Sequence, residues 1–545
     1  MKVQFDSQFF TSIVFISFVA LLFRLYTSFV HKPNILRSKL RKQGISGPPP
    51  TILLGNLMEI MKSQLTIPIS HSFLTHNTVS LVFPKFEEWR KQYGEVFVFS
   101  FGNIQSLCVS QTDMIKEIAT YTSFDLGLPP FHKKLFRPLL GDGILTSNGT
   151  TWAHRRKILA PELYIDKVKF YFLCISKGMV NIISEAGESL LNLWNSKIEA
   201  QSGVADINID EDLKIFSGNV ISRACFGSDY SKGQEIFLKL GALQEVGFSW
   251  KNLSSAVPGM RYLPTKTNRK SWILAKEVKS LILQVVKERK EKTSFEKDLL
   301  QMVIEGAKKS NLTQEAGDNF IIDNCKNIYL AGFESTAVVS SWCLMLLASN
   351  QNWQDRARAE VLEICRGRIP DLDMLSKMKQ YYGTYRTILV IFSRLLTYIN
   401  YAMQLTMIIH ETLRLYPPAP LLLRHAFKDM KFGNIVVPKG TGLWILIISL
   451  HTNPDIWGDD AYKFNPERFA NGVAGACKHP HAYMPFGVGP RICLGQNLAI
   501  LELKMLIALI LSNFSFSLSP RYIHSPALGI TMKPDHGVQL LVRKL

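Results

Sequence analysis

The amino-acid sequence predicts a mainly α-helical protein with small β-sheets, preceded by one helix that spans a membrane. Apolar residues recur at helical spacing through several long segments, which include 166–200, 269–290, 315–350 and 351–365. Short runs typical of β-strands occur at 95–101, 431–437 and 537–542. An apolar stretch near the N-terminus is long enough to cross a bilayer.

This apolar stretch runs from Phe9 to Val30 and contains a single charge, Arg24, near its end. Several Lys and Arg residues follow it and only one lysine precedes it, so the positive-inside rule predicts a single-pass anchor with the bulk of the chain in the cytosol. The stretch is longer than the core of a signal peptide, and no small-residue cleavage site follows it. The expected organisation is an anchor and basic linker in residues 1–45, with its helix at about 9–30, and one domain in residues 46–545.

The chain carries a formal net charge of +19. A basic balance suits a nucleic acid, a membrane surface or an acidic partner protein. Basic runs interleaved with aromatic residues are absent from the sequence, as are nucleic-acid-binding motifs, so we expect no nucleic-acid partner. The eight cysteines are scattered, which is typical of a reducing compartment. Cys477, His479 and His481 do not have the spacing of zinc ligands to be shared with Cys493.

One cysteine has an unusual setting. The segment PFGVGPRICLG, residues 485–495, holds Cys493 in a glycine-rich turn beside Arg491. Glycine lets a backbone approach a ligand closely, and arginine brings a permanent planar charge. Helical periodicity starts after Gly495, which puts Cys493 just before a helix N-terminus, where the helix dipole and free N–H groups favour a thiolate. This setting is typical of a soft metal centre.

Glu411 and Arg414 lie one turn apart on one face of a predicted helix. Such a pair is usually solvated and contributes little. Here the flanking residues are apolar and two prolines end the helix at once, which predicts a buried pair that needs a further partner. Arg468, in the aromatic segment FNPERF, is a candidate for that partner.

The segment AGFEST, residues 331–336, puts an acid and two hydroxyls, Glu334, Ser335 and Thr336, in the middle of a long apolar helix. Such hydroxyls bond to carbonyls one turn earlier and, with a glycine, bend or open a helix. One interpretation is a kinked core helix. The other is a local groove with proton-donating groups over a reactive centre.

Three further residues are candidates for binding an anion. Trp152 and Arg156 share one helix face, and Arg424 is an isolated cation in an apolar run. Each is more often a surface residue than a ligand contact. Together with Arg491, these residues have the charge to neutralise a dianionic cofactor.

The order of these motifs, WxxxR, AGxES, ExxR, a PERF loop and FxxGxRxCxG, resembles that of the cytochrome P-450 haem-thiolate monooxygenases from the anchor onward. The resemblance implies the cytochrome P-450 fold and haem b (iron protoporphyrin IX) as cofactor. It implies that Cys493, in the motif from Phe486 to Gly495, is the axial ligand of the haem iron. The residues implied to hold the haem propionates are Trp152, Arg156, Arg424 and Arg491.

The resemblance also assigns roles to the two helical motifs. Glu411, Arg414 and Arg468 match a buried triad that fixes the haem-binding core. Glu334 and Ser335 match an acid–alcohol pair that delivers protons to dioxygen. Threonine is commoner at the position of Ser335, so we expect oxygen activation to survive with looser coupling of electrons to product.

The implied reaction inserts one oxygen atom of O2 into an apolar small molecule at the endoplasmic reticulum membrane. Electrons would come from NADPH through NADPH-cytochrome P-450 reductase, docked on a basic face. The stretches FPKFEEWRKQYG, YMPFGVGPRICLGQNLAILELK and FSFSLSPRYIHSP are similar to the plant seventy-two clan and, within it, to the group that oxidises gibberellins and related diterpenoid acids. Candidate pocket walls are Phe333, Leu421–Leu423 and the loop from Leu128 to Thr146.

Residues 381–404 depart from the family pattern, in which an MKQ segment runs directly into LTM at the start of the ExxR helix. The segment is apolar, leaves the motifs on both sides intact and resembles a translated retained intron more than an extra helix. Two alternative functions stay open. One is a haem-thiolate isomerase or dehydratase, against which Glu334, Ser335 and the intact cysteine loop argue. The other is a non-functional splice product that cannot hold haem.

Overall fold

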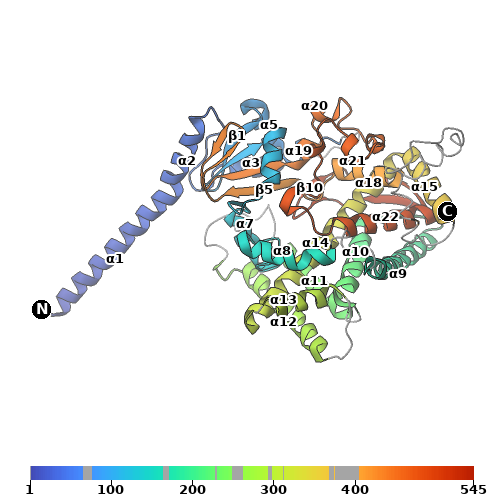
Figure 1. Ribbon diagram of the computed structural model, residues 1–545, viewed down its shortest axis with the longest axis horizontal. Coiled ribbons are helices and arrows are strands. Elements are labelled where there is room, and N and C mark those ends of the chain that lie inside the picture. Colours follow the sequence, from blue (N-terminus) through green and yellow to red (C-terminus); the bar gives the residue numbers. More distant parts are fainter. Residues whose placement is uncertain are drawn as a thin grey trace. The chain divides into compact units, whose positions relative to one another are not determined.

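The computed structural model describes residues 2–65, 76–163, 171–227, 230–247, 262–291, 298–310, 312–366, 374 and 404–545. The predicted insertion lies outside the described residues except for its last residue, Gln404. The chain forms two compact units. Figure 1 shows the helices and strands of both. Unit 1 is Met1–Ile67, Phe83–Pro129 and Leu422–Leu446, and unit 2 is Pro68–Val82, Pro130–Leu421 and Ile447–Leu545.

Unit 1 is organised around a five-stranded sheet with the strand order β1-β2-β8-β5-β3. β2 pairs with β1 in antiparallel and with β8 in parallel orientation. The strands of unit 1 are β1 (Val96–Phe101), β2 (Ile104–Val109), β3 (Leu126–Gly127), β5 (Leu421–Ala426), β6 (Met430–Phe432), β7 (Ile435–Val437) and β8 (Gly442–Leu446). Its helices are α1 (Lys2–Tyr26), η1 (Thr27–His31), α2 (Lys32–Arg41), α3 (Leu57–Leu65), α5 (Pro84–Tyr93) and α6 (Thr112–Thr120).

An aromatic cluster packs α5 onto this sheet. The ring centroid of Phe86 on α5 lies 5.1 Å from that of Phe99 on β1 and 5.9 Å from that of Trp444 on β8. Trp89 lies 6.1 Å from Phe97. All five side chains are buried, and aromatic pairs at such distances add stabilisation beyond the area that they bury.

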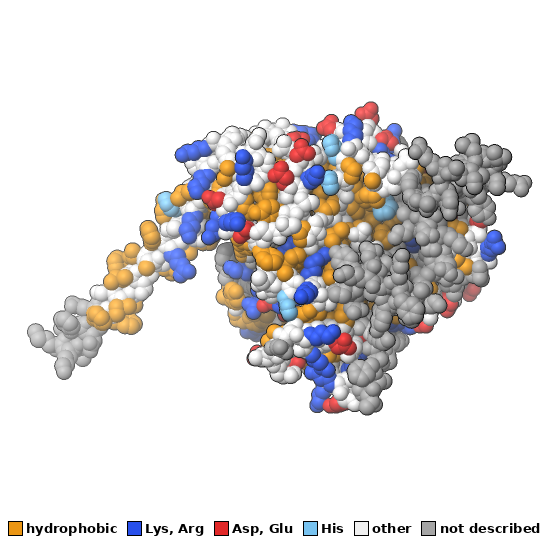
Figure 2. Space-filling view, in the orientation of Figure 1, with side chains coloured by type: hydrophobic (Ala, Val, Ile, Leu, Met, Phe, Trp, Pro, Cys, Tyr) orange, Lys and Arg blue, Asp and Glu red, His pale blue; other side chains and the backbone are white. Residues whose placement is uncertain are grey.

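The N-terminal helix is longer than the predicted 9–30, because α1, η1 and α2 follow one another from Lys2 to Arg41. Figure 2 shows exposed hydrophobic side chains along α1. The stretch from Phe9 to Arg41 is long and apolar enough to cross a membrane, and its most apolar part is 0% buried. Two helices of unit 2 are also long and apolar enough, but their most apolar parts are 83% and 56% buried. The N-terminal helix is therefore the candidate membrane anchor.

The basic segment after the anchor does not all face solvent. Arg37 is buried and donates hydrogen bonds to the carbonyl oxygen of Gly47, at 2.9 Å, and to Oε1 of Gln105, at 3.3 Å. A Cβ atom at Gly47 would lie 1.9 Å from the carbonyl oxygen of Val98, so only glycine fits there. The end of α2 is thus fixed against the sheet of unit 1.

Unit 2 is mainly helical. The longer helices are α7 (Pro130–Leu140), α8 (Gly149–Leu163), α9 (Tyr171–Ala200), α10 (Ile209–Phe226), α11 (Tyr230–Gly247), α12 (Lys266–Glu291), α13 (Leu299–Lys309), α14 (Gln314–Ser349), α15 (Gln351–Cys365), α18 (Gln404–Leu415) and α22 (Gln496–Asn513). The shorter ones are α4 (Thr78–Val82), α19 (Ile447–His451), α20 (Pro454–Trp457), η6 (Pro466–Phe469), α21 (Gly472–Gly475), η7 (Pro480–Ala482) and η8 (Gly489–Arg491). A three-stranded sheet, β4 (Val204–Asn208), β12 (Gln539–Lys544) and β9 (Phe514–Leu518), and a hairpin, β10 (Pro526–Leu528) and β11 (Met532–Pro534), complete it.

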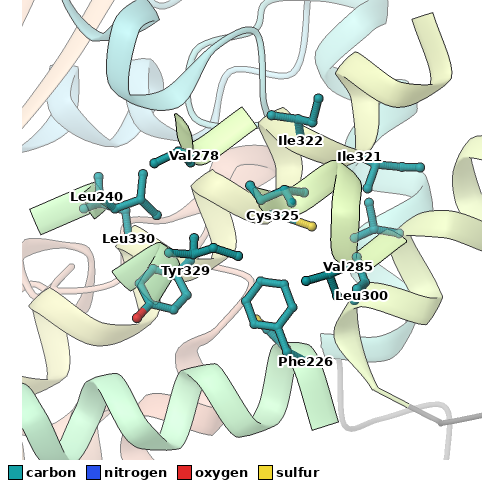
Figure 3. Packing of buried hydrophobic residues seen from close by; sticks show 14 of the residues in the cluster. Phe226, Leu240, Val278, Val285, Leu300, Ile321, Ile322, Cys325, Tyr329 and Leu330 are labelled. Atoms are coloured by element: carbon teal, nitrogen blue, oxygen red, sulfur yellow. The ribbon is translucent and has the colours of Figure 1, made fainter. Parts of the chain in front are cut away.

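Apolar side chains from five consecutive long helices form one cluster in unit 2 (Figure 3). Phe226 comes from α10, Leu240 from α11, Val278 from α12, Leu300 from α13 and Tyr329 from α14. α14 also packs along α10 and against α22. Because α14 is surrounded in this way, its rotation about its own axis is fixed, and so is the direction of each side chain in the segment 331–336.

Most of the predicted elements are present. The segments 269–290, 315–350 and 351–365 form α12, α14 and α15, and 171–200 forms α9, whereas residues 166–170 lie outside the described residues. The predicted β-type run at 431–437 consists of two short strands, because the chain reverses there into the antiparallel hairpin β6–β7. Gly433, at the turn, has a φ of 54° that glycine adopts at little cost.

Candidate functional site

The segment around Cys493 forms a closed loop. The backbone N–H of Cys493 donates a hydrogen bond to the carbonyl oxygen of Phe486 at 2.9 Å. Between them, Gly487 and Gly489 have φ values of 69° and 72°, which side-chain-bearing residues rarely adopt. Helix α22 begins three residues after the cysteine, as the sequence predicted.

The environment of the thiol differs from the expectation based on position alone. A hydrogen bond from the backbone N–H of Gly495 and the charge of Arg156 favour the thiolate, but burial outweighs both and raises the pKa of Cys493. The contributions that the sequence predicted are therefore present, but in the uncomplexed side chain they are smaller than the effect of burial. A coordinated metal ion would reverse it, because a thiol that coordinates a metal is deprotonated outright.

Cys493 nevertheless has an accessible surface. An accessible side chain at this position is open to a ligand. The same pattern occurs in the middle of α14, where Ala331 is exposed and Ser335 half-buried, one turn apart on one face. Phe333 and Glu334, on the other faces, are buried. Cys493 and the Ala331–Ser335 face of α14 are thus the accessible parts of the two motifs.

Two arginines share one indole ring near the cysteine loop. The guanidinium carbon of Arg491 lies 4.3 Å from the ring centroid of Trp152, and that of Arg156 lies 5.7 Å from it. Nη2 of Arg491 donates to Oδ1 of Asn148 at 3.0 Å. The predicted cations Arg491 and Arg156 are thus brought together, and a cluster of like charges is suited to bind an anion with more than one negative charge.

The loop that leads to Asn148 is fixed by α14. Asp323 accepts a hydrogen bond from the backbone N–H of Asp142 at 2.8 Å, and Asn327 accepts one from that of Leu145 at 2.8 Å. A Cβ atom at Gly141 would lie 1.9 Å from Asp323, so the loop can approach α14 only with glycine at that position. The sequence showed neither contact, because both join residues far apart in the chain.

His132 on α7 is a candidate that sequence reasoning missed. Its Nδ1 atom is buried and has no hydrogen-bond partner among the described residues. Burial and the charge of Arg491 lower the pKa of His132 to about 4. A buried ring nitrogen beside an arginine is suited to an anionic ligand. A single histidine in the segment PFHKK gave no signal in the sequence.

Arg424 belongs to unit 1, on β5, and is 7% exposed. It donates to the carbonyl oxygen of Leu423 at 2.9 Å, and none of the acids that the structure describes pairs with it. Burial lowers the pKa of Arg424 to about 10. A buried cation of this kind requires a counter-charge that the described residues do not provide.

The structure brings the ExxR pair and the PERF arginine together, as predicted. Glu411 and Arg414 are fully buried and make two hydrogen bonds, Arg414 Nε to Glu411 Oε2 at 2.7 Å and Nη2 to Oε1 at 2.8 Å. Nε of Arg468 lies 3.6 Å from Oε1 of Glu411. Arg414 also donates to three backbone carbonyls, those of His451, Ala461 and Lys463.

His451 connects this cluster to the cysteine loop. Its Nε2 atom accepts the backbone N–H of Met484 at 3.0 Å, and its Nδ1 atom lies 3.2 Å from the carbonyl oxygen of Arg414. An N–H can only donate and a carbonyl can only accept, so the ring must be neutral with its proton on Nδ1. Accordingly, burial lowers the pKa of His451 to about 3. No pattern in the sequence indicates this link.

The hydroxyls of the α14 motif bond to their own helix. Ser335 donates to the carbonyl oxygen of Ala331 at 2.7 Å and Thr336 to that of Gly332 at 3.1 Å. These are the predicted bonds to the preceding turn, and α14 is continuous through the motif. The side chain of Glu334 points to neighbouring elements, where Gln244 and Thr531 bind its two oxygens at 2.7 and 2.8 Å. Burial raises the pKa of Glu334.

Comparison with known proteins agrees with this geometry. The family model for cytochrome P-450 matches residues 62–381 and 400–540, so residues 382–399 fall outside both matched segments. The chain is 46% identical over 523 residues to cytochrome P-450 714C2 of Oryza sativa subsp. japonica, with 94% of each chain covered. It is 39% identical over 545 residues to cytochrome P-450 714A2 of Arabidopsis thaliana, with 97% of each chain covered.

The family model covers most of the chain, and these relatives are plant proteins aligned over nearly their whole length. Members of this family are haem enzymes that receive electrons from redox partners and act on hydrophobic substrates. The chain therefore belongs to the cytochrome P-450 family and is a monooxygenase.

Proposed function

We propose that this enzyme binds haem b through Cys493 and inserts one oxygen atom of O2 into an apolar small molecule. The observation that carries the proposal is the accessible thiol in a glycine loop whose backbone is closed by Phe486. Bound haem supplies the activation of dioxygen, in the overall reaction RH + O2 + 2 e⁻ + 2 H⁺ → ROH + H2O.

The cations described above would bind the two carboxylates of the haem. Arg491 and Arg156, held against Trp152, and the buried Arg424 are the predicted residues. To them we add His132, whose unpartnered Nδ1 is suited to the same group. The haem carboxylates match these residues in charge, because Arg424 is buried without an acidic partner among the described residues.

Glu411, Arg414 and Arg468 hold the cysteine loop in place rather than contacting the substrate. Arg414 and His451 connect the triad to Met484, immediately before the motif that contains Cys493. A loop that is held at Met484 and closed by the hydrogen bond from Cys493 to Phe486 keeps the sulfur in one position, which preorganises the metal site.

Proton supply is assigned to Glu334 and Ser335. Ser335 lies on the accessible face of α14, and Glu334 is a buried acid whose pKa burial raises above its ordinary value, which favours its protonated, proton-donating form. Phe486 and Gly495 shape the cysteine loop, and Thr336 braces the turn beside Ser335.

The anchor and the net charge support a membrane location and an electron donor for the enzyme. We place the domain on the cytosolic face of the endoplasmic reticulum membrane, held by the single N-terminal span, because basic residues follow that span. The net charge of +19 favours an acidic electron donor, for which we propose NADPH-cytochrome P-450 reductase.

We propose gibberellins or related diterpenoid acids as the substrate class. The support is the sequence resemblance of the scaffold segments, together with apolar candidate walls such as Phe333, which is buried in unit 2. Leu421–Leu423, which are half-buried, and the loop from Leu128 to Thr146 are the other candidate walls.

The interpretation of residues 381–404 as an insertion is supported by the break in the family match, which leaves 382–399 outside. The domain organisation that we propose is therefore an anchor in 1–45 and a monooxygenase domain in 46–545 that carries this insertion.

The experiment that tests the function uses the full-length protein in lipid vesicles with NADPH-cytochrome P-450 reductase, under ¹⁸O2, with a panel of gibberellins. We expect one ¹⁸O atom in each product molecule and strict dependence on NADPH. Conversion that needs neither O2 nor reductase would instead show an isomerase or dehydratase. Loss of all haem binding would show a non-functional splice product.

A further inference from the structure

Glu334 is held by two partners that carry no charge. The amide Nε2 of Gln244, in the last turn of α11, lies 2.7 Å from Oε2 of Glu334. The hydroxyl of Thr531, in the turn between β10 and β11, lies 2.8 Å from Oε1. Glu334 is only 5% exposed. Both oxygens of its carboxyl group are thus hydrogen-bonded by protein groups.

The charged groups around this acid act from further away. Lys533 on β11 and Lys214 on α10 each lower the pKa of Glu334, as do the two hydrogen bonds. Burial has the larger effect and raises it. Lys214 is itself paired with Glu211 at 2.7 Å, and both lysines act on Glu334 through their charge, not through a hydrogen bond to it.

The chemistry of the two partners is matched to an acid that changes its protonation state. An amide and a hydroxyl can each donate or accept a hydrogen bond, whereas lysine and arginine can only donate. When Glu334 is ionised, Gln244 and Thr531 both donate to it. When Glu334 is protonated, the amide oxygen of Gln244 or the hydroxyl oxygen of Thr531 can accept a hydrogen bond from its O–H group, so the buried acid keeps a partner.

We propose that Gln244 and Thr531 are positioning residues that keep Glu334 hydrogen-bonded in both of its protonation states, so that it can release and regain a proton in each turnover. This inference deepens the proposed function and rests on the role in proton supply assigned there to Glu334. A cation in place of Gln244 would hold the acid ionised, and an apolar residue would hold it neutral.

The test changes Gln244 in these two opposite directions. Gln244→Lys introduces an opposite charge, which lowers the pKa of an acid by about 1–3 units. Gln244→Leu and Thr531→Val each remove one hydrogen-bond donor to the ionised form of Glu334, and each should therefore raise the pKa of Glu334. Gln234→Leu is the matched control, because Gln234 is also on α11 and bonds Asn219 at 2.7 Å, away from the acid.

Two readouts are needed. The first is infrared titration of the carboxylic acid band that is lost in Glu334→Gln, which needs no turnover. The second is product formed per NADPH consumed, over a range of pH. The reduced carbon monoxide spectrum of each variant shows that haem is loaded.

We expect the titration of Glu334 to move to lower pH by about 1–3 units in Gln244→Lys, to higher pH in Gln244→Leu and Thr531→Val, and not to move in Gln234→Leu. The optimum of product per NADPH should move in the same directions. Shifts of the same sign in the Lys and Leu variants, or none in any variant, would overturn the proposal. If Glu334→Gln itself leaves product per NADPH unchanged, the assigned role of Glu334 is wrong, which is a separate result. If Gln244→Lys does not fold, the Leu and Val variants decide the question.

Discussion

Ser335 stands at a position where the family resemblance leads to an expectation of threonine. Its hydroxyl lies on the accessible face of α14 and donates to the carbonyl oxygen of Ala331 at 2.7 Å. A serine has more rotational freedom than a β-branched threonine, so it can leave this bond and turn to the open side of the helix. That freedom is consistent with retained proton transfer and looser coupling.

Replacement of Ser335 by alanine should leave haem binding intact and divert electrons into hydrogen peroxide. Positioned proton transfer contributes about 10²–10⁴-fold to a reaction, so we expect product per NADPH to fall by about tenfold or more. Ser340→Ala is the control, because Ser340 is buried on the same helix and its hydroxyl bonds the carbonyl oxygen of Thr336. An unchanged ratio in Ser335→Ala would remove the serine from the proton path.

Arg414→Ala should destabilise the protein strongly. The variant leaves Glu411 as a fully buried carboxylate without its ion-pair partner, which costs roughly 3–5 kcal/mol. The measurement is the free energy of unfolding, with haem content as a second readout. Arg356→Ala is the control: Arg356 pairs with Glu467 at the same distance, 2.7 Å, but both are exposed, so a loss under about 1 kcal/mol is expected. Equal losses in the two variants would contradict the account of the triad.

At the scale of single residues, contacts between neighbours in the sequence could be predicted and contacts between distant segments could not. The pairing of Glu411 with Arg414 could be predicted, because i,i+3 spacing on a helix fixes their proximity. The link from Arg414 through His451 to Met484 could not, because it depends on how distant segments pack. The raised pKa of the uncomplexed Cys493 could not be predicted, because it depends on burial, which the sequence does not show.

At the scale of elements, the start of α18 is held by α15. Glu360 on α15 is fully buried and accepts the backbone N–H of Leu405 at 2.8 Å. Burial raises the pKa of Glu360 to about 8. This contact fixes α18 directly after the suspected insertion. Deletion of residues 381–404 would join Gln380 to Leu405, so a glutamine would again occupy the first position of the helix.

We therefore expect the deletion of 381–404 to raise the yield of haem-loaded protein, with activity rising in proportion. A longer connection is cheap in closure entropy, since each doubling costs only about 0.6 kcal/mol. An exposed apolar segment is the larger liability, because it drives association. The measurement is haem content per protein for both forms expressed side by side.

A full-length polar variant separates these two causes. It changes to serine the apolar residues Ile388, Leu389, Val390, Ile391, Phe392, Leu395 and Leu396. If apolar surface is the cause, this variant recovers haem loading as the deletion does. Equal loading and equal activity in all three forms would mean that the segment is tolerated, most simply as an added helix on the membrane surface.

The elements that the sequence predicted well are those with a long uniform period. α12, α14 and α15 begin and end within a few residues of the predicted bounds, because an amphipathic or buried helix repeats the same pattern over many turns. The β-type run at 431–437 was predicted, but its division into the hairpin β6–β7 was not, because two three-residue strands give too short a pattern and the turn depends on a single glycine.

At the scale of the whole molecule, buried neutral histidines link stability to pH. His451 is fully buried, and His76, 7% exposed, has its Nδ1 atom 2.7 Å from the hydroxyl of Tyr416. The pKa of each is lowered from 6.5 to about 3, mainly by burial. Below pH 6.5 the unfolded chain binds protons that the folded protein does not, so stability is lost as the pH falls from 6.5 toward 3.

Each such histidine contributes a slope of up to about 1.4 kcal/mol per pH unit in this window. We expect His76→Gln to be less stable than the wild type at neutral pH but to lose less stability on acidification. The measurement is the free energy of unfolding of both proteins between neutral and mildly acidic pH. Parallel curves for the two proteins would show that His76 is charged in the folded state or does not titrate in this range.

Fold class and family were both predictable from the sequence, because the motifs occur in a fixed order along the whole chain. The extent of the anchor was not: the helix begins at Lys2 and continues to Arg41, and Arg37 turns inward to bind Gly47 and Gln105. A charge count treats every arginine as solvated, and only the packing shows which one is not.

The most direct measurement of the central claim is the carbon monoxide difference spectrum of the reduced, full-length protein, compared between the wild type and Cys493→Ala. Cys477→Ala is the control, since Cys477 is also partly accessible and lies in the same part of the chain. We expect a thiolate-type spectrum from the wild type and from Cys477→Ala, and none from Cys493→Ala. A thiolate-type spectrum that persists in Cys493→Ala would contradict the assignment of Cys493 as the iron ligand.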